Sequence, residues 1–140
     1  MTNDLMLGFG RCDFTPDGPV GMNSNLVSNE VIDRIFVTCL AWKDKDTTVL
    51  QYSMDLRNIY NEQYDFVAPH ISKALGIPQE QLLISVTHNH SAPDISLQNR
   101  EDIKDWTYRI GLPAMCQAGK DALQDLSPVT GAVSGKSITQ

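Results

Sequence analysis

Two of the three histidines in this chain, His88 and His90, are separated by one residue, and the pair is the clearest chemical signal in the sequence. They follow residues 81–87, whose composition predicts a buried strand. Side chains at i and i+2 of a strand lie on one face, so both imidazoles are expected to converge on one point. Such a pair suits zinc, which takes three or four protein ligands. The spacing therefore makes the pair a candidate for part of a metal site.

The same spacing also fits a hydrogen-bonded or surface pair without a metal. Asp55 and Asp94 are candidate carboxylate partners, because each ends an element that flanks the same edge of the predicted sheet. Both have a competing structural role that takes precedence: Asp55 caps the following segment, and Asp94 starts a turn. His70 follows Pro69 within a predicted helix, and we interpret it as a partly buried helix residue rather than a ligand.

Other catalytic motifs are absent or incomplete. The chain contains no Gly-x-Ser-x-Gly sequence, and none of its three cysteines lies in a marked catalytic setting. The glycines Gly8 and Gly10 lack the strand and helix that flank a dinucleotide fingerprint. Residues 131–137 end in Gly-Lys-Ser, but only three residues separate the two glycines, whereas a phosphate-binding loop requires four.

The strands that position the histidine pair are predicted from alternating apolar residues. Residues 7–14 predict a short, glycine-weakened strand. Residues 35–42 and 47–55 predict a hairpin joined by the polar turn 43–46. Because both faces of 35–42 are largely apolar, this strand is expected to be covered on both sides.

Two helical regions are expected beside these strands. The first is capped by Asn61 and ends at Gly76, and Pro69 inside it is expected to kink the helix or to mark a later start. Apolar residues at helical spacing over 103–122, interrupted at Gly111, predict two helices or one kinked helix.

The order of these elements predicts the fold class. The turn-rich loop 15–30 is a candidate wall of a binding site, and residues 129–139 predict a last strand. The order β-β-β-α-β-α-β predicts an α/β (α+β mixed) fold, in which helices pack against a mixed β-sheet. A length of 140 residues predicts a single domain, residues 1–140.

Composition excludes several classes of protein. A net charge of −6 and the absence of any basic run argue against nucleic-acid binding. No apolar run approaches the roughly 20 residues of a membrane-spanning helix, so no transmembrane segment is expected. The first residues lack the features of a secretory signal, which predicts a cytoplasmic location. The cysteines are odd in number and widely spaced, which predicts reduced thiols.

Three segments in order carry a family resemblance: residues 8–16, 53–56 and 76–93. In the family that these segments resemble, their usual forms are Asp-Ile-Thr-Pro, an Asp-Leu strand end and Thr-His-Thr-His-Ser-Gly-Pro. On these motifs the chain resembles the N-terminal part of the catalytic region of the neutral/alkaline, non-lysosomal ceramidase family. It departs from the last motif at Asn89, which is expected to face away from the site, and at Ala92, which is expected to alter the following turn.

The resemblance implies a zinc-dependent amidase that cleaves the N-acyl bond of ceramide or a related lipid amide. It assigns His88 as a zinc ligand and His90 as a catalytic residue beside the metal, holding the substrate amide or a bound water. This division agrees with the chemistry, since zinc polarises a carbonyl and an imidazole N–H stabilises the developing oxyanion. The implied partner is a lipid amide.

The family's other ligands, a His, a Glu and a Tyr, come after the region that matches. The chain is therefore expected to be an N-terminal fragment of a larger catalytic domain and inactive alone, so its own standing as an enzyme stays open. One alternative is a non-enzymatic α/β interaction module. Another is a divergent metallo-β-lactamase-like hydrolase, although Ala92 and Pro93 replace two of that motif's ligands. An incomplete domain would expose apolar surface at Leu40, Trp42 or Trp106 and could form a homo-oligomer through it.

Overall fold

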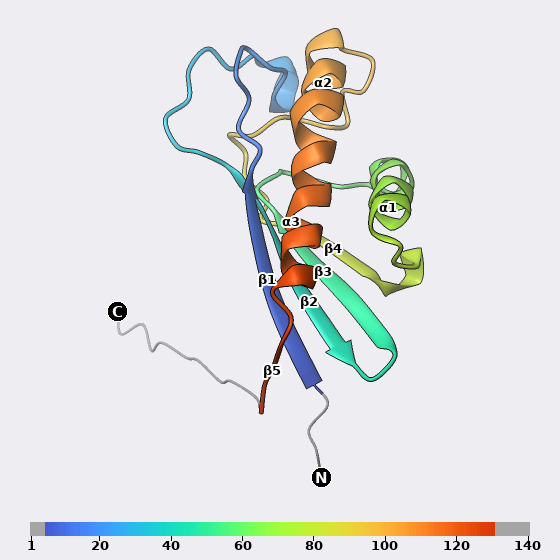
Figure 1. Cartoon of the computed structure of the whole chain (residues 1–140). Helices are drawn as coiled ribbons and strands as arrows, with labels where there is room; N and C mark the ends of the chain where they lie inside the picture. Colours follow the sequence, from blue (N-terminus) through green and yellow to red (C-terminus); the bar gives the residue numbers. More distant parts are fainter. Residues whose placement is uncertain (1–4, 131–140) are drawn as a thin grey trace, which may run out of the picture.

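The computed structural model describes residues 5–130, which form a five-stranded sheet covered by helices (Figure 1). The strand order across the sheet is β4-β3-β2-β1-β5. Neighbouring strands are antiparallel except β3 and β4, which are parallel, so the predicted mixed sheet is confirmed. The strands are β1 Leu5–Asp13, β2 Phe36–Asp44, β3 Thr47–Met54, β4 Leu82–Val86 and β5 Ser127–Pro128.

The helices lie on one side of this sheet (Figure 1). Helix α1 packs beside α3, and α3 lies across β1 and β2. The predicted break near Gly111 is a π-helical turn, η3, that joins α2 directly to α3. None of the helices in residues 5–130 is long and apolar enough to cross a membrane. The helices are η1 Asn23–Asn25, α1 Asn61–Leu75, η2 Gln79–Gln81, α2 Glu101–Trp106, η3 Thr107–Gly111 and α3 Leu112–Gln124.

The first glycine pair of the sequence allows α3 to approach β1 closely. A Cβ atom added at Gly8 would fall inside van der Waals distance of the backbone oxygen of Ala122. The same holds for Gly10 and the backbone oxygen of Ala118. These glycines therefore serve helix-to-sheet packing, which explains their spacing without a nucleotide.

The core lies between the sheet and its helices. Alternate residues of β2 and β3 point into it and are fully buried, as the alternating pattern of 47–55 predicts. Tyr52 crosses this core, and its hydroxyl donates a hydrogen bond of 3.1 Å to the backbone oxygen of Met115 in α3. The fully buried residues of these two strands are Val37, Cys39, Ala41, Leu50, Tyr52 and Met54.

No helix of residues 5–130 lies on the outer face of the sheet (Figure 1), so the prediction that residues 35–42 are covered by elements on both sides is wrong for the described chain. Phe9, Trp42 and Leu83 on this face are 50%, 37% and 62% exposed. Local contacts shield part of the apolar surface: the guanidinium carbon of Arg11 lies 3.7 Å from the ring centroid of Phe36. The apolar character of the outer positions reflects such contacts across the sheet rather than a second layer of helices.

Trp106 does not belong to the exposed apolar surface, and this prediction is wrong. It is 2% exposed, and its indole Nε1 donates a hydrogen bond of 2.9 Å to the backbone oxygen of Phe14. Of the two other residues named for such a surface, Leu40 is half-buried and Trp42 is exposed.

The ends of two elements differ from the predictions. The residue that caps α1 is Tyr60, and Asn61 is the first helical residue; the Tyr60 backbone N–H donates to the side-chain oxygen of Gln63. The helix runs without a break through Pro69. The last strand, β5, precedes the predicted range 129–139, most of which lies outside the described residues.

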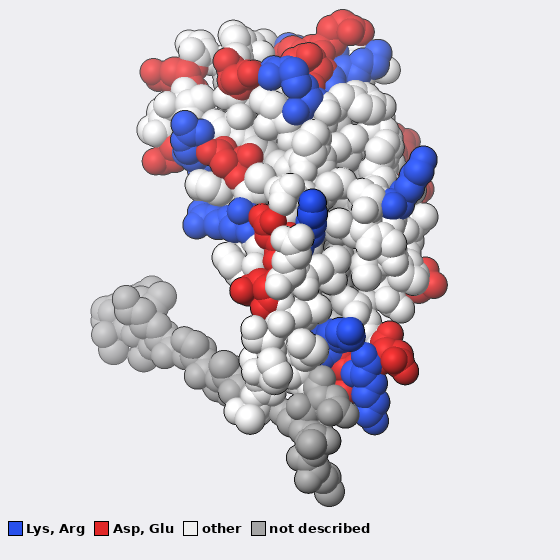
Figure 2. All heavy atoms as spheres, in the orientation of Figure 1, with Lys and Arg blue, Asp and Glu red and all other residues white. Residues whose placement is uncertain are grey.

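Charged side chains are mixed over the face seen in Figure 2. Asp and Glu alternate with Lys and Arg near both ends of the molecule, and no continuous basic area appears in this view. This distribution agrees with the acidic net charge of −6.

Candidate metal and substrate site

The histidine pair lies just beyond the end of β4, in a segment that is no longer a strand. β4 ends at Val86, and His88 adopts a left-handed backbone conformation with φ of 63°. Backbone hydrogen bonds hold this segment against the end of β3, from Thr87 N to Met54 O at 2.9 Å and from Asn89 N to Leu56 O at 3.2 Å. The expectation that strand geometry places the pair is therefore wrong, and a turn at His88 does so instead.

The two imidazoles nevertheless converge. The Nε2 atoms of His88 and His90 lie 3.0 Å apart, and the ring planes are nearly perpendicular, at 85°. Zinc binds imidazole nitrogen at roughly 2.0–2.1 Å, so one ion can lie within reach of both Nε2 atoms. Both side chains are exposed, which leaves this point open on the surface of the described chain.

A backbone contact determines which nitrogen of His88 is available. Its Nδ1 lies 2.9 Å from the backbone oxygen of Arg57, which can only accept a hydrogen bond. Nδ1 must therefore carry the proton, so neutral His88 presents the lone pair of Nε2. This is the arrangement in which histidine ligates a metal. In the absence of a metal, the Nε2 proton of His90 can be donated to that same lone pair.

Arg57 connects the pair to the loop over 15–30. Its Nη1 donates a hydrogen bond to the side-chain oxygen of Asn23 in η1. Its Nε is buried and has no hydrogen-bond partner in the described chain. Sequence reasoning missed both residues, although Arg57 directly follows the Asp-Leu strand end that the resemblance uses.

The two candidate carboxylates do not join the histidines. Asp55 accepts hydrogen bonds from the backbone N–H of Phe36 at 2.9 Å and from the hydroxyl of Thr87 at 3.2 Å. Asp94 accepts from the backbone N–H and the hydroxyl of Ser96. Within residues 5–130, no group of three or more His, Cys, Asp and Glu side chains is placed to hold a metal ion. The described chain therefore supplies two imidazoles and no third ligand.

The other titratable residues considered from sequence lie elsewhere. His70 is exposed rather than partly buried, and its Nδ1 lies 2.7 Å from the backbone oxygen of Phe66 in its own helix. Cys12, Cys39 and Cys116 are free thiols. Burial raises the pKa of Cys39 to about 12, so this residue stays protonated at neutral pH.

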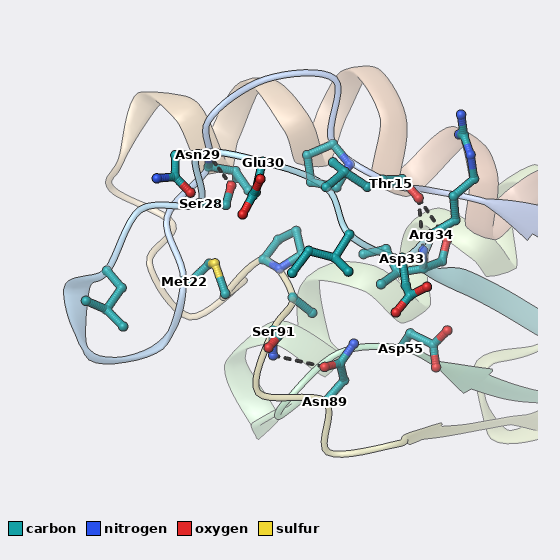
Figure 3. Close-up of a pocket in the computed structure, with 18 of the residues that line it drawn as sticks. Thr15, Met22, Ser28, Asn29, Glu30, Asp33, Arg34, Asp55, Asn89 and Ser91 are labelled. Atoms are coloured by element: carbon teal, nitrogen blue, oxygen red, sulfur yellow. Dashed lines mark hydrogen bonds between the residues drawn. The ribbon is translucent and has the colours of Figure 1, made fainter.

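A pocket of about 740 Å³ lies beside the histidine motif (Figure 3). Thr87, Asn89 and Ser91 line it, whereas the two histidines between them do not. Asn89 is therefore directed away from the pair, as expected, and its side-chain oxygen accepts a hydrogen bond of 2.9 Å from Ser91 N. The turn-rich loop and the residues that follow it, up to Ile35, form most of the remaining wall.

The fold of this chain is similar to that of solved structures. No protein-family model and no curated protein matches the sequence. Among solved structures, the neutral ceramidase from Pseudomonas aeruginosa matches 89% of this chain with a TM-score of 0.72 and 17% sequence identity. A structure described as "Ceramidase complexed with C2" matches the same share with a TM-score of 0.68, also at 17% identity. This chain spans 22% of the length of each of those chains. The solved structures that share this fold are thus ceramidases, the proteins that the three sequence motifs resemble.

Proposed function

We propose that this chain forms part of the catalytic domain of a zinc-dependent amidohydrolase that cleaves the N-acyl bond of ceramide or a related lipid amide. The observation that carries the proposal is the pair of Nε2 atoms, 3.0 Å apart, at the end of β4. It occurs in a fold shared with ceramidases, one of them described as complexed with C2. The substrate class rests on that likeness and on the motifs around the pair.

The donor set of the pair fits zinc. His88 would hold the ion through Nε2, and its Nδ1–H donates to the backbone oxygen of Arg57, which fixes the ring orientation. Zinc, when bound, would polarise the amide carbonyl and lower the pKa of a bound water. Because a zinc site needs three or four protein ligands, the others would come from protein segments outside the described residues.

His90 would act on the substrate rather than as the main ligand. Its Nε2 lies within hydrogen-bond distance of the His88 nitrogen that would hold the metal. An Nε2–H at this place can donate to the amide carbonyl oxygen, where negative charge develops as the bond to the nucleophile forms. His90 is therefore the residue of this chain to which we assign stabilisation of the oxyanion.

The 140-residue chain is expected to bind zinc weakly and not to hydrolyse an amide. Two imidazoles do not complete the site, and the chain spans only 22% of the solved ceramidases that it matches. Weak metal binding would therefore be a property of residues present in this chain, whereas catalysis would need further ligands.

Zinc binding tests the assignment directly. A competition titration against a chromophoric chelator compares the chain with His88→Ala and with His70→Ala, the control at an exposed histidine outside the site. We expect His88→Ala to weaken zinc binding at least about tenfold and His70→Ala to leave it unchanged. Equal zinc affinity in all three proteins would contradict the ligand assignment. Hydrolysis of an N-acyl lipid amide by the full-length gene product, lost in His90→Ala with zinc retained, tests the catalytic part.

A further inference from the structure

The carboxylate of Asp55 replaces a backbone acceptor at the end of β3. In an antiparallel pair, two opposite residues can exchange both of their N–H···O bonds. Phe36 and Asp55 come next to the last pair of the ladder between β2 and β3, and the backbone N–H of Asp55 donates to Phe36 O at 3.0 Å. The return bond, from Phe36 N at 2.9 Å, goes to Oδ2 of the Asp55 side chain. The chain therefore leaves the sheet after Met54 while the Phe36 N–H keeps an acceptor.

The second carboxylate oxygen of Asp55 binds the segment that carries the histidines. Its Oδ1 accepts a hydrogen bond of 3.2 Å from the hydroxyl of Thr87, the residue directly before His88. The backbone N–H of Thr87 donates to Met54 O at 2.9 Å. Thr87 is thus held at the end of β3 by its backbone and by its side chain. One carboxylate joins the start of β2, the end of β3 and the segment after β4.

This attachment comes immediately before the turn at His88. His88 has a φ of 63°, a conformation that is unfavourable for a residue with a Cβ atom, so contacts on both sides must maintain it. On one side Thr87 is bound by Asp55. On the other side the backbone N–H of Asn89 donates to the backbone oxygen of Leu56 at 3.2 Å. The left-handed residue is therefore fixed between two hydrogen-bonded neighbours.

Both partners of the contact between His88 and Arg57 depend on Asp55. The backbone oxygen of Arg57, 2.9 Å from His88 Nδ1, lies two residues after Asp55, in the segment that Asp55 holds against β2. The imidazole belongs to the residue after Thr87, which the same carboxylate holds through its other oxygen. A change at Asp55 would therefore displace the ring and its acceptor relative to one another.

We propose that Asp55 is a positioning residue of the candidate metal site, which orients the His88 imidazole through Thr87 and through residues 55–57. This inference rests on the proposed function, because it concerns the nitrogen that would hold zinc. A carboxylate behind a metal-binding histidine often accepts the proton of the ring itself. Here a backbone oxygen accepts that proton, and the carboxylate acts one step further away.

The tautomer of His88 in the zinc-free chain tests this role without a metal or a substrate. A two-bond ¹H–¹⁵N correlation spectrum at about pH 8, where an imidazole is mostly neutral, distinguishes ring nitrogens with and without a proton. We expect the proton on Nδ1 in the parent chain and a mixture of both tautomers in Asp55→Ala. His70, whose Nδ1 lies 2.7 Å from the backbone oxygen of Phe66, gives a reference signal that should not change. An unchanged His88 signal in Asp55→Ala would overturn the proposal.

The amide variant separates positioning from metal ligation. An asparagine at position 55 can accept from Phe36 N and donate to the Thr87 hydroxyl, so Asp55→Asn should keep the Nδ1 tautomer and a zinc affinity close to that of the parent. Asp55→Ala should weaken zinc binding about tenfold, as loss of an outer partner of a ligand does. Equal losses of zinc in the two variants would assign the effect to the carboxylate charge or to direct ligation and would contradict positioning.

Thr87 provides a milder change on the same hydrogen bond. Thr87→Val keeps the branched shape and removes the hydroxyl, whereas Thr87→Ser keeps the hydroxyl. Because Thr87 is exposed, both variants should fold, and circular dichroism checks this. We expect mixed tautomers of His88 and about threefold weaker zinc binding in Thr87→Val, and values near the parent in Thr87→Ser. Identical behaviour of the two variants would argue against the contact with Asp55.

Asp94→Ala is the matched control for charge. Asp94 also accepts two hydrogen bonds, both from Ser96, so its loss removes the same charge and the same number of bonds. The His88 tautomer and the zinc affinity should stay as in the parent, and a change as large as that in Asp55→Ala would overturn the specific role of Asp55. Failure of the proposed function is recognised separately, since it would appear as a zinc affinity unaltered in His88→Ala.

Discussion

The Nδ1 atom of His88 lies 2.9 Å from the backbone oxygen of Arg57, and this contact directs the opposite ring nitrogen toward His90. The contact is made while His88 holds a left-handed backbone conformation, with φ of 63°. For a residue with a Cβ atom, this conformation is unfavourable by about 1–2 kcal/mol. Backbone strain therefore coincides with the residue that presents the candidate metal-binding atom, as is common at functional sites.

Replacing His88 by glycine should reveal this strain. We expect His88→Gly to be more stable than His88→Ala by about 0.5–1 kcal/mol, because glycine adopts a positive φ without the steric cost. Both variants remove the imidazole and its hydrogen bond. The difference between their free energies of unfolding therefore measures the cost of the backbone conformation alone. Urea unfolding measures the free energies of the two variants.

At a position without backbone strain, the Gly and Ala variants would have the opposite order of stability. Alanine is normally the more stable residue of the two where φ is negative. An Ala variant of His88 as stable as the Gly variant, or more so, would show that the position is unstrained.

Gly10 should tolerate no side chain. We expect Gly10→Ala to destabilise the fold by about 3 kcal/mol, because its Cβ would overlap the backbone oxygen of Ala118 and would force α3 away from β1. Gly18→Ala is the matched control, since nothing lies within 4 Å of a Cβ at that position. Thermal unfolding should show a large decrease in Tm for the first variant and little change for the second; similar values would contradict the packing argument.

The buried hydroxyl of Tyr52 should contribute a measurable hydrogen bond. Tyr52→Phe removes its donation to Met115 O and keeps the ring, so the free energy of unfolding should fall by about 1 kcal/mol. Tyr108→Phe removes a hydroxyl from a side chain that is 57% exposed and should cost almost nothing. Chemical denaturation of both variants measures the difference, and a Tyr52→Phe protein as stable as the parent would argue against this bond.

Burial of Cys39 should make stability decrease at alkaline pH. Burial raises the pKa of its thiol from 9.0 to about 12, so between these values the unfolded chain loses the proton while the folded chain keeps it. The free energy of unfolding should therefore be fully retained below pH 9 and decrease above it, by at most about 1.4 kcal/mol per pH unit from this group.

The variant Cys39→Ala isolates this contribution. Burial also raises the pKa of Tyr52, whose effect has the same sign, so the comparison is best made between pH 9 and 10. In that interval the decrease should be smaller in Cys39→Ala than in the parent chain. Identical slopes would show that the thiol is not the group responsible.

Local sequence patterns determined most of the secondary structure. The hairpin of β2 and β3, the helix that ends at Gly76 and the strand before the histidines follow from alternation, helical spacing and turn residues. The His-x-His spacing also identified the candidate site, because residues two positions apart are close in most backbone conformations. These features depend on neighbours in the chain, and such interactions can be predicted from sequence.

The tertiary structure alone decided which faces are covered and how the site is oriented. The apolar outer positions of β2 gave no sign that only one side of the sheet carries helices, and Trp106 gave no sign of its hydrogen bond to Phe14. The Nε2 convergence depends on the turn at His88 and on the backbone oxygen of Arg57, 31 residues away in sequence. Contacts between residues so far apart are set by how the elements pack, and no periodicity within one element encodes them.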